Sequence, residues 1–479
     1  MKPPNKDHQR SAEEAEGSPL TKQNTVEPNT VRTQSRAAVS SGLARVRQAA
    51  RRDKQGRFTA LLHHWTVDLL RQSFLALKRE AAPGVDGVRW QEYETGLEDR
   101  LNDLHSRIHR GAYRAQPSRR VYIPKSDGRQ RPLGIAAVED KIVQQAAASI
   151  LNQIYEEDFK GFSYGFRPGR SQHHALDALS VGLTRKRVNW VLDADIRGFF
   201  DNIDHEWMVK FLQHRIADVR VLRLIQKWLK AGVSEQGQWS GTKVGTPQGA
   251  VISPLLANVY LHYVLDLWVE VWRKKCARGD VIIIRYADDF VMGFEQRADA
   301  ERFQQELRER LGKFGLELNA DKTRVIEFGR FADSNRRERG KGKPETFDFL
   351  GFTHICGKNK KTGRFEVRRK TVAKRLSKKL QEIKQQLRQR MHDRTSQTGE
   401  WLKSVVRGYF QYHAIPGNRG RLHSFRSSVV RYWRHVIQRR SQNAKPGWRR
   451  MTALVRRYIP TVRVAHPFPG VRFDAMHPR

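Results

Sequence analysis

The sequence predicts an α+β protein of two or three domains, because 479 residues exceed what a single hydrophobic core usually holds. Short β-branched runs around turn residues indicate antiparallel hairpins at 121–135 and 281–294. In longer segments between and beyond these hairpins, apolar residues recur at helical spacing. Hydrophobic residues make up 38% of the chain, so most of it should fold.

Charge narrows the range of partners, since 90 Lys and Arg against 50 Asp and Glu give a net charge of +40. This excess predicts a polyanionic partner, with nucleic acid as the first candidate and a membrane surface as the alternative. No apolar run reaches the roughly 18 residues that a membrane span needs. Two distant cysteines, Cys276 and Cys356, argue against a disulfide scaffold or a zinc module. Without the apolar segment of a signal peptide, we expect a cytoplasmic, nucleoid-associated protein.

The N-terminal part is expected to be helical after a disordered tail. Residues 1–44 are polar, with almost no large apolar side chains, and whether they order on RNA is open. A basic helical segment follows, and apolar residues then recur at helical spacing over 58–77. The turn-rich loop 82–87, taken alone, is a plain connection between helices.

Residues 121–135 predict a hairpin that turns at Asp127-Gly128. Its arms carry Lys125 and Arg131, near enough across the turn to bind one anion together. A triphosphate site and ordinary exposed charges explain this pair equally well. A long helix should follow from 139 to 154.

Two glycine-containing loops are suited to close approach by a ligand. The loop 163–171 mixes aromatic residues with Arg167 and Arg170, a combination that favours contact with nucleic acid. The turn 245–249 carries Gln248, which can both donate and accept hydrogen bonds, and it opens an apolar helix over 255–271. A plain helix-entry turn is the simpler explanation of the second loop.

The segment 190–196 is typical of a buried strand that ends in acid. Asp193 and Asp195 point the same way along it, because side-chain directions alternate. Asp195 comes at the strand's end, where a carboxylate can reach a site without being buried. Asp201 and Asp204 are more simply a turn residue and the N-cap of the next helix.

The hairpin 281–294 is the stretch around which the chain is organised. Apolar β-branched runs flank Asp288 and Asp289 at its tip. Adjacent acids disfavour folding there, because like charges repel, and a divalent metal would remove the repulsion. A solvated turn is the alternative for an isolated Asp-Asp pair.

Beyond the hairpin the sequence predicts further mixed structure and then, after residue 352, a helical region. An amphipathic helix over 303–314 should end at Gly315, and strands are expected at 316–319 and 324–328 around Lys322. Residues 347–352 predict one further strand with a glycine that exposes its backbone. Residues 358–394 hold fifteen Lys and Arg against three Asp and Glu and predict a basic amphipathic helix. Its charged face favours contact with a phosphate backbone, with an ordinary solvated face as the alternative. Two more helices, at 402–412 and 422–436, would complete a small helical domain.

Asp195, Asp288 and Asp289 would meet if their two strands are neighbours in one sheet. Phosphoryl transfer to a 3′-hydroxyl uses such a set, because two divalent ions stabilise the attacking and leaving oxygens. Together with the basic composition, this hypothesis favours a polymerase.

The sequence resembles the reverse transcriptases. Their motifs stand here in family order: Arg131-Pro132-Leu133-Gly134-Ile135, Asp195-x-x-x-x-Phe200, Gly245-Thr246-Pro247-Gln248-Gly249, Tyr286-Ala287-Asp288-Asp289 and Phe349-Leu350-Gly351-Phe352. The run 195–205, the loop 83–87 and Gly408-Tyr409-Phe410 resemble group II intron-encoded proteins in particular.

This resemblance implies a right-hand polymerase fold, with fingers and palm containing an antiparallel sheet at 45–355, an α-helical thumb or maturase domain at 356–440, and a short basic tail at 441–479. It implies two Mg²⁺ ions on Asp195, Asp288, Asp289 and the Ile196 carbonyl. Lys125 and Arg131 would bind the triphosphate, Gln248 would line the nucleotide pocket, and Phe200 would exclude a ribose 2′-hydroxyl. The side chains expected to contact nucleic acid are Arg167, Arg170, Lys322, Lys374, Arg375 and Lys378.

The partners implied are group II intron RNA, target DNA with a primer, and dNTPs, while the oligomeric state stays open. Many relatives continue into a DNA-binding segment and a nuclease with Cys pairs. This sequence has neither that length nor those cysteines, so we expect no DNA nicking by this chain and a primer from elsewhere. Two alternatives remain: a relative domesticated for defence or repair, and a splicing-only RNA-binding protein with an inactive palm.

Overall fold

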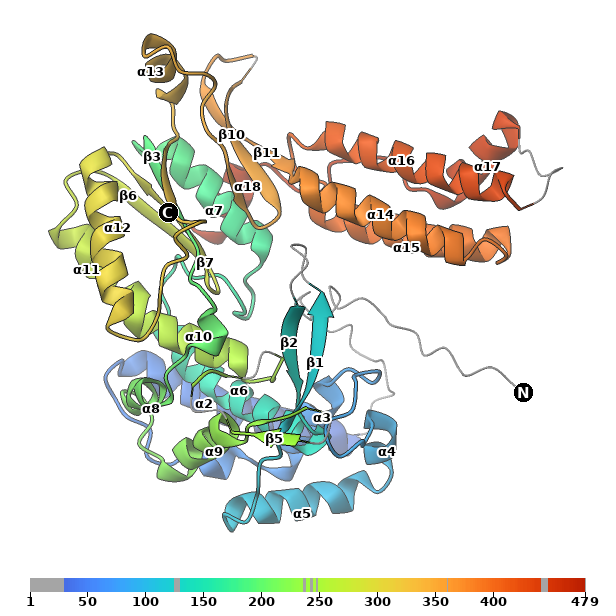
Figure 1. Cartoon of the computed structure of the whole chain (residues 1–479). Coiled ribbons are helices and arrows are strands. Elements are labelled where there is room, and N and C mark those ends of the chain that lie inside the picture. Colours follow the sequence, from blue (N-terminus) through green and yellow to red (C-terminus); the bar gives the residue numbers. More distant parts are fainter. Residues whose placement is uncertain are drawn as a thin grey trace. The chain divides into compact units, whose positions relative to one another are not determined.

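The computed structural model describes residues 30–124, 130–235, 238–241, 244–246, 249–359, 361–440 and 447–478. The chain forms two compact units, each built from several segments (Figure 1). The first unit takes the chain up to Arg170, then Ile196–Trp272 and Leu307–Leu318. The second takes Ser171–Asp195, Arg273–Glu306 and the chain from Asn319 onward.

The first unit is mainly helical around one long buried helix, α6 (Val138–Asp158). The helices α2 (Thr30–Arg52) and α3 (Val67–Ala76) pack against α6. Its small sheet has the order β2-β1-β4-β5, in which the predicted hairpin forms the antiparallel pair. The remaining elements of this unit are η1 (Leu62–His64), α4 (Trp90–Glu94), α5 (Leu97–His109), β1 (Ser118–Pro124), β2 (Gln130–Ile135), η2 (Phe199–Asp201), α8 (His205–Gln213), α9 (Val219–Lys230), β4 (Val233–Glu235), β5 (Gln238–Ser240), α10 (Ser253–Leu261), the π-turn η3 (His262–Asp266) and α11 (Leu267–Lys275), whose last turn belongs to the second unit.

Two aspartates cap helices of the first unit, and one of these caps was predicted. The Asp204 carboxylate accepts the Trp207 backbone N–H at 2.8 Å and caps α8, which confirms its expected role. Asp218 caps α9 and also accepts the N–H groups of Leu61 and Leu62, so one buried carboxylate ties two segments together.

The second unit contains a four-stranded sheet of order β6-β7-β3-β8. Its strands are β3 (Trp190–Ala194), β6 (Val281–Tyr286), β7 (Asp289–Phe294) and β8 (Arg324–Glu327). Helix α7 (Gln172–Arg185) packs against β6, while α12 (Arg297–Gly312) begins in this unit and ends in the first. After the short helix α13 (Ala332–Glu338), a separate sheet joins β9 (Phe347–Phe349), β10 (Phe352–Lys358) and β11 (Phe365–Thr371).

Long helices follow this second sheet and form their own core (Figure 1). They are α14 (Ala373–Gln389), α15 (Thr395–His413), α16 (Arg419–Gln438) and α17 (Trp448–Tyr458). The apolar positions expected in the first of them, including Leu376, Ile383 and Leu387, are buried in this core. Trp433 also belongs to this core and is fully buried.

Several expectations about this architecture were wrong. Helix α2 begins at Thr30, so the polar tail does not extend to residue 44, because the alanine-rich stretch of that segment favours a helix. Residues 347–352 form two strands rather than one, since Leu350 and Gly351 both adopt a positive φ and reverse the chain. The basic segment from 358 starts as β10 and β11 and becomes helical only at Ala373.

The segment expected to be a C-terminal tail is folded where it is described. Met451 and Tyr458 of α17 join the core of the long helices, and α18 (Pro469–Met476) packs against α7. Arg472 of α18 and Arg369 of β11 both pair with Asp177 of α7, at 3.3 Å and 2.9 Å. Arg185 adds two hydrogen bonds to Asp474. The tail was misjudged because its partners lie far away in the sequence.

Acid is expected to destabilise the second unit, because burial lowers the pKa of His173, His354 and His413 to about 3. Such a histidine is neutral in the folded state and protonates near pH 6.5 when unfolded, so its stabilising contribution is lost as the pH falls below 6.5. Each group costs up to about 1.4 kcal/mol per pH unit in that range.

Between pH 7.5 and pH 5.5, the melting temperature of the His354→Phe variant should therefore fall less than that of the wild type. His354 is buried and stacks on Phe347 at 4.7 Å, a contact that phenylalanine can keep. The same change at the exposed His423 serves as the control and should leave the pH dependence unaltered. An identical pH dependence in both variants would contradict the assignment.

Candidate active site

Asp195 and Asp289 lie opposite each other at the ends of two neighbouring strands. Strands β3 and β7 are antiparallel, and their last paired residues are Ala194 and Phe290. Asp195 and Asp289 occupy the next position on each strand, at the same end of the sheet. This register confirms the sequence-based hypothesis that the two strands are neighbours in one sheet.

Asp288 lies in the two-residue turn between β6 and β7, where Tyr286 pairs with Asp289. Its neighbour Ala287 has a φ of 56°, a left-handed conformation that is strained for a residue with a Cβ. The fully buried guanidinium of Arg285 donates a hydrogen bond to the Ala287 carbonyl at 3.0 Å. A buried arginine thus holds the turn that presents the acid pair, a role that the sequence pattern gave no sign of.

The acids repel one another electrostatically. Surrounding protein atoms, and then the negative charges of Asp288 and Asp195, raise the pKa of Asp289 to about 7. Asp289 itself keeps contact with solvent, and the two neighbouring negative charges oppose its ionisation. The positive charges of Arg375 and Lys322 oppose this shift.

Two side chains from the turn before β8, Asn319 and Lys322, contact the Asp195 carboxylate. Lys322 Nζ lies 2.8 Å from Asp195 Oδ2, and Asn319 Nδ2 donates to the same oxygen at 3.0 Å. The Asn319 backbone N–H also donates to the Asp195 carbonyl at 2.8 Å. Lys322 was expected to contact nucleic acid, and in the structure its ammonium, on a side chain that is 58% exposed, binds Asp195. Asn319, which stands three residues before Lys322 in the sequence, was not predicted as a site residue.

The donor set fits a hard divalent cation, because all three side chains offer carboxylate oxygens and a cation would relieve their repulsion. Within the described ranges, no three His, Cys, Asp or Glu side chains are gathered closely enough to form a ready-made metal site. One oxygen of this set, Asp195 Oδ2, accepts hydrogen bonds from Lys322 and Asn319.

The first unit carries the other residues expected around a nucleotide. Arg131 lies in β2 opposite Ile123 of β1. Phe200 lies in η2, which starts after Gly198 in a left-handed conformation. Ile196 is buried next to Asp195 in the chain and forms an isolated β-bridge with Leu318. Lys125 and Gln248 lie outside the described residues.

The loop around Gly245 is fixed against the segment that carries Phe200. The Thr246 backbone N–H donates to the Phe200 carbonyl at 2.9 Å, and Gly245 donates to Ile203 at 2.8 Å. A Cβ at Gly245, whose φ is 92°, would come within 2.9 Å of the Asp201 carbonyl oxygen. A Cβ at Gly249 would lie 3.0 Å from the Gly134 carbonyl oxygen of β2. The two glycines therefore allow this loop to touch both η2 and β2.

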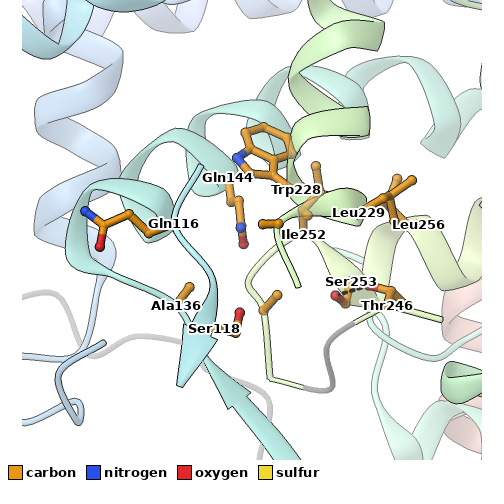
Figure 2. A pocket seen from close by; sticks show the side chains of 12 residues that line it. Gln116, Ser118, Ala136, Gln144, Trp228, Leu229, Thr246, Ile252, Ser253 and Leu256 are labelled. Atoms are coloured by element: carbon orange, nitrogen blue, oxygen red, sulfur yellow. Dashed lines mark hydrogen bonds between the residues drawn. The ribbon is translucent and has the colours of Figure 1, made fainter. Parts of the chain in front are cut away.

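A small cavity lies beneath this loop (Figure 2). Side chains from β1, α6, α9 and α10 converge on it, and Thr246 and Ser253 hydrogen-bond to each other at 2.6 Å. Gln144 Oε1 accepts the Val251 backbone N–H at 3.0 Å. The cavity has room for about one water molecule and is too small for a nucleotide. Its lining side chains therefore serve to support the loop.

Comparisons with known proteins identify this arrangement. A family model described as reverse transcriptase (RNA-dependent DNA polymerase) matches residues 123–354. Protein YkfC of Escherichia coli strain K12 is 38% identical over 293 residues, covering 54% of this chain and 76% of that protein. The chain belongs to the reverse transcriptases of the group II intron-encoded family.

Two further relatives carry introns in their names. The group II intron-encoded protein LtrA of Lactococcus lactis subsp. cremoris is 36% identical over 250 residues, 49% of this chain and 41% of LtrA. An uncharacterized 91 kDa protein in the cob intron of Schizosaccharomyces pombe is 42% identical over 154 residues, 32% of this chain and 19% of that protein. The chain thus spans less than half the length of these two relatives. As a reverse transcriptase it is an RNA-directed DNA polymerase, and its family generally uses divalent metals.

The structure separates the basic residues expected to contact nucleic acid into two groups. Arg167 is buried, and its guanidinium binds Glu156 and the carbonyls of Lys160 and Ser163, so its predicted role is corrected to a structural one. Arg170 is half-buried, with hydrogen bonds to Gly161 and Ser163. Burial lowers the pKa of its guanidinium.

Helix α14 presents the second group. Lys374 and Arg375 are exposed, and Lys378 is half-buried. Arg375 also lies near Gly351 of the β9–β10 turn and acts electrostatically on Asp289. In the part of the chain that the structure describes, no helix is both long and apolar enough to cross a membrane.

Arg167→Met should destabilise this reverse transcriptase by about 3–5 kcal/mol, because it leaves Glu156 without its buried partner. RNA affinity at temperatures where the variant is folded should stay close to that of the wild type. Lys374→Met should do the reverse and weaken RNA binding without loss of stability. Urea unfolding and filter binding of RNA measure the two effects, and a selective loss of RNA affinity in Arg167→Met would overturn the structural role.

Proposed function

We propose that this reverse transcriptase binds group II intron RNA, assists its splicing, and copies it into cDNA after insertion of the intron into DNA. The observation that carries the proposal is the placement of Asp195 and Asp289 at the same end of neighbouring strands, beside the turn with Asp288. An inactive palm would have no reason to keep three repelling carboxylates together. Nucleoid DNA is then the expected place of action.

Asp195, Asp288, Asp289 and the Ile196 carbonyl would hold two Mg²⁺ ions. Bound there, the ions would lower the pKa of the primer 3′-hydroxyl and stabilise the negative charge of the leaving pyrophosphate. The chain's own groups position the substrates. Arg131 and Lys125 would bind the triphosphate, and Gln248 would line the nucleotide pocket.

The exposed cations of α14 would track the phosphate backbone of the template and primer. A basic helix suits this role because each phosphate contact releases a condensed counterion. The target DNA and the primer are further partners in the proposed reaction cycle.

Asp288→Asn should reduce cDNA synthesis on an RNA template by about 10³-fold, because a ligand that helps to stabilise the transition state loses its charge. The affinity for intron RNA should stay within a few-fold of that of the wild type, since the negatively charged Asp288 does not attract the phosphates of RNA. Primer extension in Mg²⁺ and filter binding measure the two properties. If the wild type also fails to extend a primer but still stimulates splicing, the splicing-only alternative is correct.

Phe200→Val should weaken discrimination against ribonucleotides by about tenfold or more, because the smaller side chain leaves room for a 2′-hydroxyl. The ratio of dCTP to CTP incorporation opposite a template guanine is the appropriate measurement. Phe331→Val, at a side chain that is 54% exposed, is the matched control and should leave this ratio unchanged. Equal ratios in all three proteins would remove Phe200 from the sugar-selecting role.

A further inference from the structure

Lys322 binds an oxygen that a metal ion would also need. Its ammonium lies 2.8 Å from Asp195 Oδ2, which already accepts a hydrogen bond from Asn319. Both donors converge on one oxygen atom of the carboxylate that the proposed function assigns to the metal ions. The ammonium carries a full positive charge at this position, whereas the Asn319 amide is neutral.

Local geometry keeps Lys322 close to Asp195. The Asn319 backbone N–H donates to the Asp195 carbonyl, and the Lys322 N–H donates back to the Asn319 carbonyl at 3.2 Å. The turn that carries both side chains is thereby attached to the end of β3. A lysine held there differs from a mobile surface lysine, because its reach to Asp195 is set by the backbone.

We propose that Lys322 is a positioning residue that competes with divalent cations for Asp195. It neutralises the carboxylate when no ion is bound and is displaced from Oδ2 when an ion arrives. Lys322 therefore raises the metal concentration at which the site fills and keeps Asp195 oriented before that. This inference rests on the assignment of Asp195 as a metal ligand in the proposed function.

The size of the effect follows from the exposure of the pair. The side chains of Lys322 and Asp195 are 58% and 28% exposed, so solvent screens their attraction strongly. An exposed ion pair of this kind changes an equilibrium by about three- to fivefold. We expect a change of that order in cation affinity when the positive charge is removed.

The test is Mn²⁺ binding to the full chain, measured from the electron paramagnetic resonance signal of free Mn²⁺. Lys322→Met should tighten binding by about three- to fivefold, whereas Lys322→Arg should stay within about twofold of the wild type, because it keeps the charge. Asn319→Ala, which removes the neutral donor to the same oxygen, should not tighten binding. Unchanged or weaker Mn²⁺ binding in Lys322→Met would overturn the proposal.

A double variant identifies the carboxylate through which Lys322 acts. In an Asp195→Asn background, Lys322→Met should no longer tighten binding, and an undiminished effect would again overturn the proposal. If circular dichroism shows that the Lys322→Met variant is unfolded, the Lys322→Gln variant is used in its place. The two levels of failure are distinct: a wild type without saturable Mn²⁺ binding removes the metal assignment itself, whereas binding that ignores Lys322 removes only the competition.

Discussion

The pairing of β3 with β7 is the constraint on which the rest of the site depends. A shift of one residue in this register would turn Asp195 to the opposite face of the sheet, because side chains alternate. The buried neighbours Leu192 and Met292, which are paired across the two strands, make such a shift costly. Hydrophobic packing in the sheet thus fixes where the charged groups emerge.

Stabilising that arrangement falls to cations from other parts of the second unit. Arg285 holds the turn from within, while Lys322 and Arg375 offset the negative charge from outside. The +40 net charge of the chain is therefore not only a surface for nucleic acid. Part of it is used internally, as Arg167 with Glu156 and Arg369 with Asp177 also illustrate.

Sequence patterns predicted the hairpins, the Asp204 cap, the long helices and the adjacency of the acids, because each rests on local periodicity or turn chemistry. They failed where a residue's partner is distant. Arg167 appeared in a loop suited to nucleic acid, and only the fold shows that Glu156 of the preceding helix occupies its guanidinium. Lys322 and Asn319 could be assigned only after Asp195 was placed beside them. For the same reason, α18 was not recognised as a folded element.

The attachment of α18 to α7 has a consequence for biosynthesis. Asp177 is buried between Arg369 and Arg472, and the second of these belongs to a helix near the end of the described chain. During translation α7 emerges before either arginine, so its carboxylate has neither of these partners until β11 and α18 have been synthesised.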